Sequence, residues 1–164
     1  MILSTIDENN FNAVLQIYEE GMSSGIATYE TSLPNWSTWD SAHLKICRLA
    51  LFEKNIMIAW AALSSVSNRR VYRGVAELSI YVSAKVRAKG VGKHLLLKLI
   101  QESEKKGIWT LQSGIFKDNF ASIKLHEHCG FRKIGFREKI AQRDGIWYDN
   151  VLMERRSKII GISS

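Results

Sequence analysis

The chain has 164 residues, of which 46% are hydrophobic and 24% charged, a composition typical of one globular domain. Its two cysteines are too few for a disulfide framework and its apolar runs too short to cross a bilayer, so we expect a reduced, cytoplasmic protein without a membrane segment. The formal charge of +7 fits nucleic acid, an anionic surface or a phosphorylated small ligand, but the absence of a basic arm or an aromatic-basic pattern disfavours nucleic acid.

The first third of the chain predicts one strand and two helices. Residues 2–6 are a predicted strand, and Asp7 follows as the N-cap of a helix whose apolar residues share one face. Residues 21–34 predict a loop or a broken helix, and Ser37 is the expected cap of a second helix that ends at Ile46. This alternation of strand and helix favours a layered domain.

From residue 47 onward the chain predicts six strands and two helices. The clearest helix covers residues 91–106, the other covers residues 119–128, and a turn at Asp144-Gly145 joins the last two strands. These elements predict an α+β domain, an α/β arrangement of three layers in which helices flank a mixed central sheet. The expected strands are residues 47–52, 56–66, 75–83, 109–116, 131–141 and 147–154.

A basic turn that contains two glycines joins the strand over residues 75–83 to the helix over residues 91–106. Unpaired amides at a helix N-terminus, glycines that allow close approach, and the charges of Arg87, Lys89 and Lys93 suit a diphosphate. The turn is not a P-loop, because no Gly-Lys-Ser/Thr follows, and it is not a dinucleotide fingerprint, because the third glycine is missing. The spacing alone is compatible with a diphosphate site or with a plain strand-to-helix turn.

Several blocks of the sequence, in the same order, resemble the Gcn5-related N-acetyltransferases. The run Arg87-Ala88-Lys89-Gly90-Val91-Gly92 is similar to their Arg/Gln-x-x-Gly-x-Gly/Ala motif for acetyl-CoA, and residues 119–126 with Gly130-Phe131 resemble a later motif of that superfamily. The resemblance covers residues 1–156, which we expect to form a single N-acetyltransferase domain followed by a C-terminal tail at residues 157–164. The segments that resemble the phosphinothricin acetyltransferase-like branch are Ala27-Thr28-Tyr29-Glu30 before Pro34, Tyr72-Arg73, residues 77–82, and Trp147-Tyr148-Asp149.

The resemblance implies that acetyl-CoA is the co-substrate. In this family the strand that corresponds to residues 75–83 carries a bulge and splays away from the strand at residues 109–116, and the pantetheine arm pairs with the backbone in the opening. A bulge would leave backbone groups free for a ligand, which makes the arrangement physically sound. The residues that the resemblance assigns to acetyl-CoA are Ile80, Tyr81, Val82, Arg87, Ala88, Lys89, Gly90, Val91, Gly92, Lys93, Asn119 and Ser122.

Two residues are candidates for the proton transfers of an acetyl transfer to an amine. Glu77 is the candidate base, because a carboxylate among apolar strand neighbours is unusual and burial would raise its pKa; a buried structural ion pair is the alternative. His126 is the candidate acid or base, since many relatives have a tyrosine there that protonates the departing thiolate; a structural histidine is the alternative. We expect Cys129 to serve packing, and no metal site, because no cluster of ligands has the required spacing.

The resemblance also implies the acceptor, a small amino acid analogue of the phosphinothricin or methionine sulfoximine or sulfone type, acetylated on its α-amino group by direct transfer in a ternary complex. It further implies a homodimer and a role in resistance to such antibiotics or herbicides. Arg70 and Val71 stand where proline and alanine are frequent in relatives, which leaves the acceptor open. Acetylation of a protein or peptide, and a non-catalytic module that binds acyl-CoA, remain alternatives. The residues expected around the acceptor are Tyr29, Glu30, Arg70, Val71, Tyr72 and Trp147.

Overall fold

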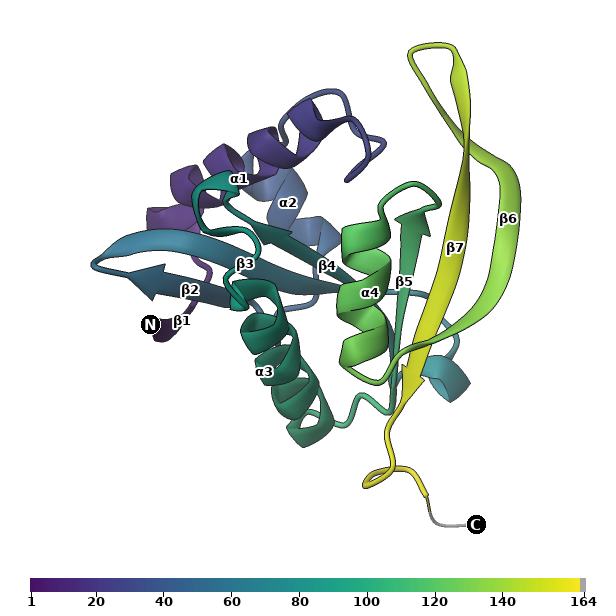
Figure 1. Cartoon of the computed structure of the whole chain (residues 1–164). Helices are drawn as coiled ribbons and strands as arrows, with labels where there is room; N and C mark the ends of the chain where they lie inside the picture. The colour runs from purple at the N-terminus through teal and green to yellow at the C-terminus, as the bar shows by residue number, and fades with distance from the viewer. Residues whose placement is uncertain (163–164) are drawn as a thin grey trace.

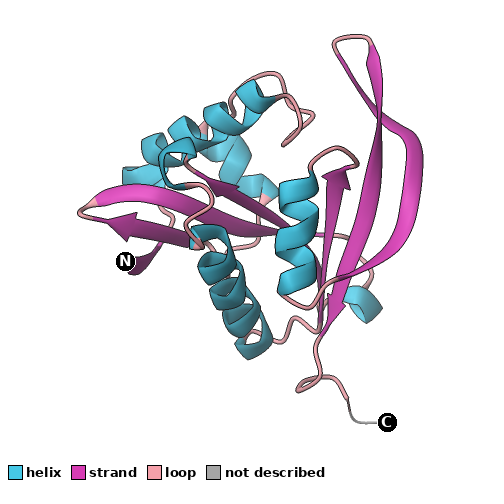
Figure 2. Cartoon of the chain, viewed as in Figure 1, coloured by secondary structure: helices cyan, strands magenta, loops and turns pink. Residues whose placement is uncertain are grey.

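The computed structural model describes residues 1–162, and within this range a seven-stranded mixed sheet has the strand order β1-β2-β3-β4-β5-β7-β6 (Figure 1). Helices cover both faces of the sheet (Figure 2), which confirms the predicted α+β fold. The strands are β1 (Ile2–Thr5), β2 (Leu49–Glu53), β3 (Ile56–Ser65), β4 (Val75–Val82), β5 (Thr110–Phe116), β6 (Arg132–Arg143) and β7 (Ile146–Arg156). The helices are α1 (Phe11–Ser24), α2 (Trp36–Ala42), α3 (Val91–Lys105) and α4 (Phe120–His128), with short 3₁₀ turns η1 (Glu8–Asn10), η2 (Arg70–Tyr72) and η3 (Ala84–Val86).

Each face of the sheet carries its own hydrophobic cluster. Leu95, Leu96 and Leu99 of α3 pack on one face together with side chains of α4, and α1 and α2 pack on the other face around Trp60. In Figure 1, α3 and α4 lie in front of the sheet and α2 lies behind it. Residues of β3 alternate between the two clusters, so this strand is buried on both faces and forms the centre of the domain. None of the described helices is long and apolar enough to cross a membrane.

The second helix starts and ends earlier than the sequence predicts. Asn35, and not Ser37, is the N-cap of α2, because its Oδ1 accepts a hydrogen bond from the N–H of Thr38 at 2.8 Å. The helix ends at Ala42, well before Ile46. Asn35 and Ser37, two positions apart, can each supply a cap, and the local pattern does not decide between them.

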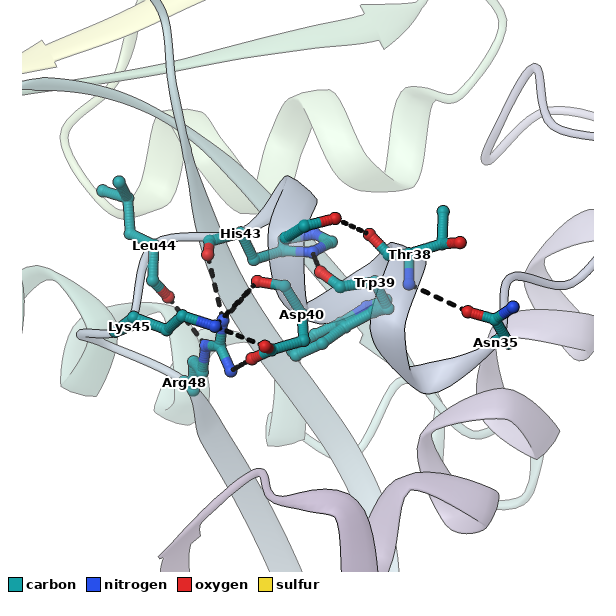
Figure 3. A network of polar contacts seen from close by, with 9 residues as sticks. Asn35, Thr38, Trp39, Asp40, His43, Leu44, Lys45 and Arg48 are labelled. Carbon is teal, nitrogen blue, oxygen red and sulfur yellow. Dashed lines mark hydrogen bonds and ion pairs between the residues drawn. The ribbon is translucent and has the colours of Figure 1, made fainter.

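A buried arginine explains why α2 ends where it does (Figure 3). Arg48 is 6% exposed, and its Nη1 lies 2.6 Å from Oδ1 of Asp40. Its Nη2 donates to the carbonyls of Asp40 (2.8 Å) and His43 (2.9 Å), and its Nε donates to the carbonyl of Leu44 (2.7 Å). The guanidinium also lies 5.1 Å from the ring centre of Trp39. Arg48 thus binds one carbonyl in the last turn of α2 and two just after the helix, and it holds this helix on the sheet.

The pairing between β4 and β5 is short. These strands run parallel and pair only at Val75–Thr110, Ala76–Leu111 and Glu77–Gln112. Beyond that point β4 remains paired with β3 and β5 remains paired with β7, each along its full length, so the two halves of the sheet separate. The predicted separation is confirmed. The predicted bulge in β4 is wrong, because the register of β4 against β3 has no shift.

The predicted C-terminal tail begins in contact with the domain. The N–H of Ser157 donates to the carbonyl of Trp109 at 2.8 Å, and Ser157 is buried. The side chain of Arg156 donates to the carbonyls of Ile160 and Gly161. Residues 163–164 lie outside the described residues, and the domain boundary at residue 156 stays a prediction.

Candidate functional site

A cavity of about 960 Å³ lies where β4 and β5 separate. Its walls come from α1 and the segment after it, β4, the turn before α3, β5, α4 and the β6–β7 hairpin. A smaller cavity of about 290 Å³ adjoins it and shares part of its wall, including Glu30 and Ser79. The predicted site residues that line the large cavity are Tyr29, Glu30, Glu77, Ile80, Tyr81, Val82, Arg87, Ala88, Gly90, Val91, Gly92, Lys93, Asn119, Ser122 and His126.

The backbone of β4 presents every second peptide group to this opening. The N–H of Ser83 donates to the carbonyl of Ile58 in β3 (2.9 Å), whereas the carbonyl of Gly74 accepts from the N–H of Thr110 at the start of β5 (3.0 Å). Odd-numbered residues of β4 therefore face β3 and even-numbered residues face β5. The backbone groups of Ile80 and Val82 therefore face the opening, whereas the backbone of Tyr81 faces β3, which does not favour its predicted pairing with the pantetheine arm. The contacts of all three residues with acetyl-CoA stay predictions.

The turn before α3 is shaped to bind an anion. Gly90, the N-cap of α3, has φ of 77° and provides no side-chain cap, so the first N–H groups of the helix have no side-chain partner there. Ala88 adopts φ of 60°, a strained value for alanine. A carboxylate oxygen of Glu20 accepts from the N–H of Ala84 at 2.5 Å and ties the turn to α1. Unpaired amides, a helix N-terminus and nearby cations fit the diphosphate of acetyl-CoA.

Glu77 is exposed, and the prediction that it is buried is wrong. It lies on the same face of β4 as Ser79 and Tyr81, but α1 and α2 cover that face only near Tyr81. The carboxylate lines the cavity and accepts a hydrogen bond from Nε2 of Gln112 at 2.9 Å. None of the ion pairs within residues 1–162 includes Glu77, which removes the structural ion pair as an explanation.

His126 is a neutral, buried histidine in the wall of the cavity. It is 1% exposed, and its Nδ1 lies 2.7 Å from the carbonyl oxygen of Ser122, which can only accept, so Nδ1 carries the hydrogen. Nε2 therefore has the lone pair, and it is buried without a partner in the described part of the chain. Burial lowers the pKa of His126 below the ordinary value for histidine. The side chain packs edge-on against Phe131, at 5.0 Å between ring centres.

Phe116, Asn150 and Arg137, which the sequence did not single out, join the predicted Tyr29 in the half of the cavity formed by β5 and the β6–β7 hairpin. Tyr29 stacks on Phe116 at 4.2 Å between ring centres, and its hydroxyl is buried, which raises its pKa. Asn150, which is 5% exposed, and Arg137 also line this half. Their strands were predicted, but no local spacing indicates which side chains of a long twisted hairpin point inward.

Five predicted site residues do not line the cavity: Lys89, Arg70, Val71, Tyr72 and Trp147. Lys89 turns back toward the carbonyl of Lys85, at 3.4 Å. The three residues of η2 precede β4 at the end where β4 and β5 are still paired and the sheet is closed, and Val71 is 62% exposed. Trp147 lies near the tip of the β6–β7 hairpin and is 56% exposed. Their contact with ligands stays a prediction.

The cysteines lie in the core and not in the cavity. Cys47 and Cys129 are both free and buried, and burial raises their pKa values, that of Cys47 to about 11. Both are therefore thiols at neutral pH, in agreement with the packing role predicted for Cys129. Within residues 1–162 no three side chains of His, Cys, Asp or Glu come together as a metal site would require.

Gly90→Ala should weaken the binding of acetyl-CoA about tenfold, because a side chain at φ of 77° costs roughly 1–2 kcal/mol and the turn relaxes away from the anion. Gly107→Ala is the matched control: Gly107 has φ of 81°, and in both positions a Cβ atom meets nothing within 4 Å. Titration calorimetry with acetyl-CoA should show the loss only in Gly90→Ala. Equal affinities in the two variants would contradict the assignment of this turn.

His126 should make the protein less stable as the pH falls. Its folded pKa is lowered, so its contribution is complete above the unfolded pKa of about 6.5 and is lost as the pH falls through the folded pKa. The slope attributable to one such group is at most about 1.4 kcal/mol per pH unit. Urea unfolding between pH 7 and 5 should therefore show a weaker pH dependence for His126→Gln than for the unmodified chain. Identical slopes would show that His126 is not held neutral by the fold.

Comparison with known proteins agrees with this geometry. The sequence matches the acetyltransferase (GNAT) domain family over residues 3–152. It is 32% identical to YwnH of Bacillus subtilis, named provisionally as a phosphinothricin acetyltransferase, over 94% of this chain and 98% of that protein. It is 27% identical to an L-methionine sulfoximine/L-methionine sulfone acetyltransferase of Pseudomonas paraeruginosa, over 86% of each chain.

The structure is similar to solved members of the same group. The crystal structure of a GNAT superfamily phosphinothricin acetyltransferase from Sinorhizobium meliloti in complex with acetyl-CoA superimposes with a TM-score of 0.84 and 29% identity. The match covers 94% of this chain and 87% of that chain. The chain therefore belongs to the GNAT family of acetyltransferases, and acetyl-CoA is its co-substrate.

Proposed function

We propose that the chain transfers an acetyl group from acetyl-CoA directly to the α-amino group of a small amino acid analogue of the phosphinothricin or methionine sulfoximine or sulfone type. The observation that carries this proposal is one cavity that contains the free edge of β4, the carboxylate of Glu77 and the aromatic side chain of Tyr29. The similarity to the acetyltransferases named above supports the acceptor class.

Acetyl-CoA supplies the acetyl thioester, and residues of the chain prepare the amine. The carboxylate of Glu77 lies in the cavity with one hydrogen-bond donor, Gln112, so it can accept a proton from the ammonium group of an acceptor directly or through water. The N–H groups of Ile80 and Val82 face the opening and can donate to an oxygen that gains negative charge. Because one cavity can hold both the acetyl thioester and the amine, the amine can attack the thioester directly, and transfer needs no covalent enzyme intermediate.

His126 serves in this proposal as a hydrogen-bond acceptor at the end of the cavity near α4. Burial disfavours its protonated form, so at neutral pH Nε2 holds no proton to give to a departing thiolate, and the hydrogen on Nδ1 is donated to the carbonyl of Ser122. The lone pair of Nε2 can instead accept a hydrogen bond or a proton. The sequence left open an acid, a base or a structural role for His126, and of the two proton-transfer roles the geometry favours the base over the acid.

The charges in the cavity match the two charged groups of an amino acid. Arg87 belongs to the turn before α3 and Lys93 to the first turn of that helix, whereas Arg137 lies on β6 in the other half and takes part in none of the ion pairs within residues 1–162. Its guanidinium can bind a carboxylate or phosphinate. Glu77 and Glu30 attract the ammonium group. Opposite charges in one cavity therefore favour a zwitterionic small acceptor.

The same proposal includes a homodimer in the cytoplasm that gives resistance to such analogues. The β6–β7 hairpin projects from the rest of the domain (Figure 1) and exposes apolar side chains, which a second copy would bury. The two free, buried cysteines fit a reduced compartment.

Light scattering at micromolar concentration should report twice the mass of the chain, and a monomer would contradict the dimer. The exposed apolar side chains of the β6–β7 hairpin, which the second copy would cover, are Ile134, Phe136, Ile140, Ile146 and Trp147.

Glu77→Gln should lower kcat by about 10²- to 10⁴-fold, because the amide cannot accept the proton that the ammonium must lose. The release of free coenzyme A thiol, with L-methionine sulfone and phosphinothricin as acceptors, measures the rate. Glu138→Gln, an exposed carboxylate on β6 outside the cavity, is the control and should keep full activity. Unchanged turnover in Glu77→Gln would remove the assignment of the base, and no thiol release from the unmodified chain with any amino acid analogue would refute the proposed function.

A further inference from the structure

The segment after α1, residues 25–30, has no helix or strand of its own, yet it carries Tyr29 and Glu30 into the cavity. We call this segment the strap. Its four consecutive carbonyls from residue 25 to residue 28 all accept hydrogen bonds from side chains of distant elements. Nδ2 of Asn119 donates to residue 26 (3.1 Å), and the hydroxyl of Tyr81 donates to residue 27 (3.3 Å). Arg143 donates to the two outer carbonyls.

Arg143 makes the shortest of these contacts and spans the strap. Its Nη2 lies 2.7 Å from the carbonyl oxygen of Gly25, and its Nη1 lies 2.8 Å from the carbonyl oxygen of Thr28. The guanidinium also lies 5.3 Å from the ring centre of Tyr148 and 5.9 Å from that of Phe116, the ring on which Tyr29 stacks. One side chain at the end of β6 therefore joins the strap, the hairpin and the aromatic wall of the cavity.

We propose that Arg143 is the positioning residue that holds the strap, and with it Tyr29 and Glu30, over the acceptor half of the cavity. This inference rests on the proposed function, because it names the residue that sets acceptor binding at that site. Arg143 takes part in none of the ion pairs within residues 1–162, so its donors are committed to the strap.

The shape of the guanidinium is essential to this role. Its planar fork donates in two directions at once, whereas a lysine ammonium is a point charge on a flexible stem. Without the fork the carbonyl of Thr28, a buried residue, loses its partner, and a buried carbonyl without a partner is unfavourable. Gly25 has φ of 78° and ends α1, so the strap can swing at this residue without moving the helix.

The hydrogen bonds between Arg143 and the strap affect only the acceptor half of the cavity. Arg143 does not line the large cavity, and none of its hydrogen bonds reaches the turn before α3. Asn119 and Tyr81 still hold the centre of the strap when Arg143 is replaced. We therefore expect a change in acceptor binding with no change in the binding of acetyl-CoA.

Steady-state kinetics of Arg143→Lys and Arg143→Met, with L-methionine sulfone and acetyl-CoA varied separately, test the inference. Both variants should raise the KM for the acceptor by about 10- to 100-fold, the loss expected for two charge-assisted hydrogen bonds, and leave the KM for acetyl-CoA within about twofold. Arg132→Met is the control, because Arg132 is an exposed residue of the same strand and pairs with Glu154 at 2.6 Å. It should change neither KM.

Hydrogen–deuterium exchange of the strap gives a second readout that needs no acceptor. Amides of residues 26–30 should exchange faster in Arg143→Met than in the unmodified chain, while the amides in the middle of α1 keep their rates. Three results would overturn the inference. They are an acceptor KM in Arg143→Lys equal to that of the unmodified chain, equal increases in the KM values for acceptor and acetyl-CoA, or unchanged hydrogen exchange of the strap in Arg143→Met. If the unmodified chain acetylates no amino acid analogue, the proposed function fails, and the exchange experiment alone decides whether Arg143 holds the strap.

Discussion

The early end of pairing between β4 and β5 is the constraint on which the site depends. Backbone hydrogen-bonding groups inside a sheet are almost always paired with a neighbouring strand. Here β4 is committed to β3 and β5 to β7, so the sheet opens after three residue pairs and leaves the backbone of Ile80 and Val82 without a strand partner. An interior edge of this kind can pair with an extended, amide-bearing ligand as it would with another strand. The resemblance to the family predicted a bulge at this point, and this chain reaches the geometry without one.

The two halves of the cavity are built in different ways. The half proposed for acetyl-CoA consists of strand backbone and a helix N-terminus, whose geometry is set by main-chain hydrogen bonding and tolerates most side-chain changes. The proposed acceptor half consists of side chains on the strap and on a twisted hairpin, held by long-range contacts such as those of Arg143. Arg48 has a similar role under α2 (Figure 3), where it fixes Trp39 beside the smaller cavity. Side-chain substitutions should therefore alter the proposed acceptor half more than the proposed acetyl-CoA half.

Local patterns predicted the parts of this structure that local physics determines. The alternation along β4, the apolar face of α3 and the glycine turn before it are properties of a few neighbouring residues, and the structure has all three. The exposure of Glu77 depends on how far α1 and α2 extend across the sheet, which no strand pattern contains. The contact of Arg143 with the strap joins residues more than 100 positions apart, so the sequence showed only one more arginine in a basic hairpin.

Hydrogen exchange of single amides in β4, followed by NMR with and without acetyl-CoA, tests most directly whether the ligand pairs with the free edge of this strand. The amides of Ile80 and Val82 should become protected when acetyl-CoA binds, because their N–H groups face the opening. Those of Ser79 and Tyr81 should change little, because they already face β3. Protection confined to the odd-numbered residues, or no protection anywhere in β4 at saturating acetyl-CoA, would contradict the account.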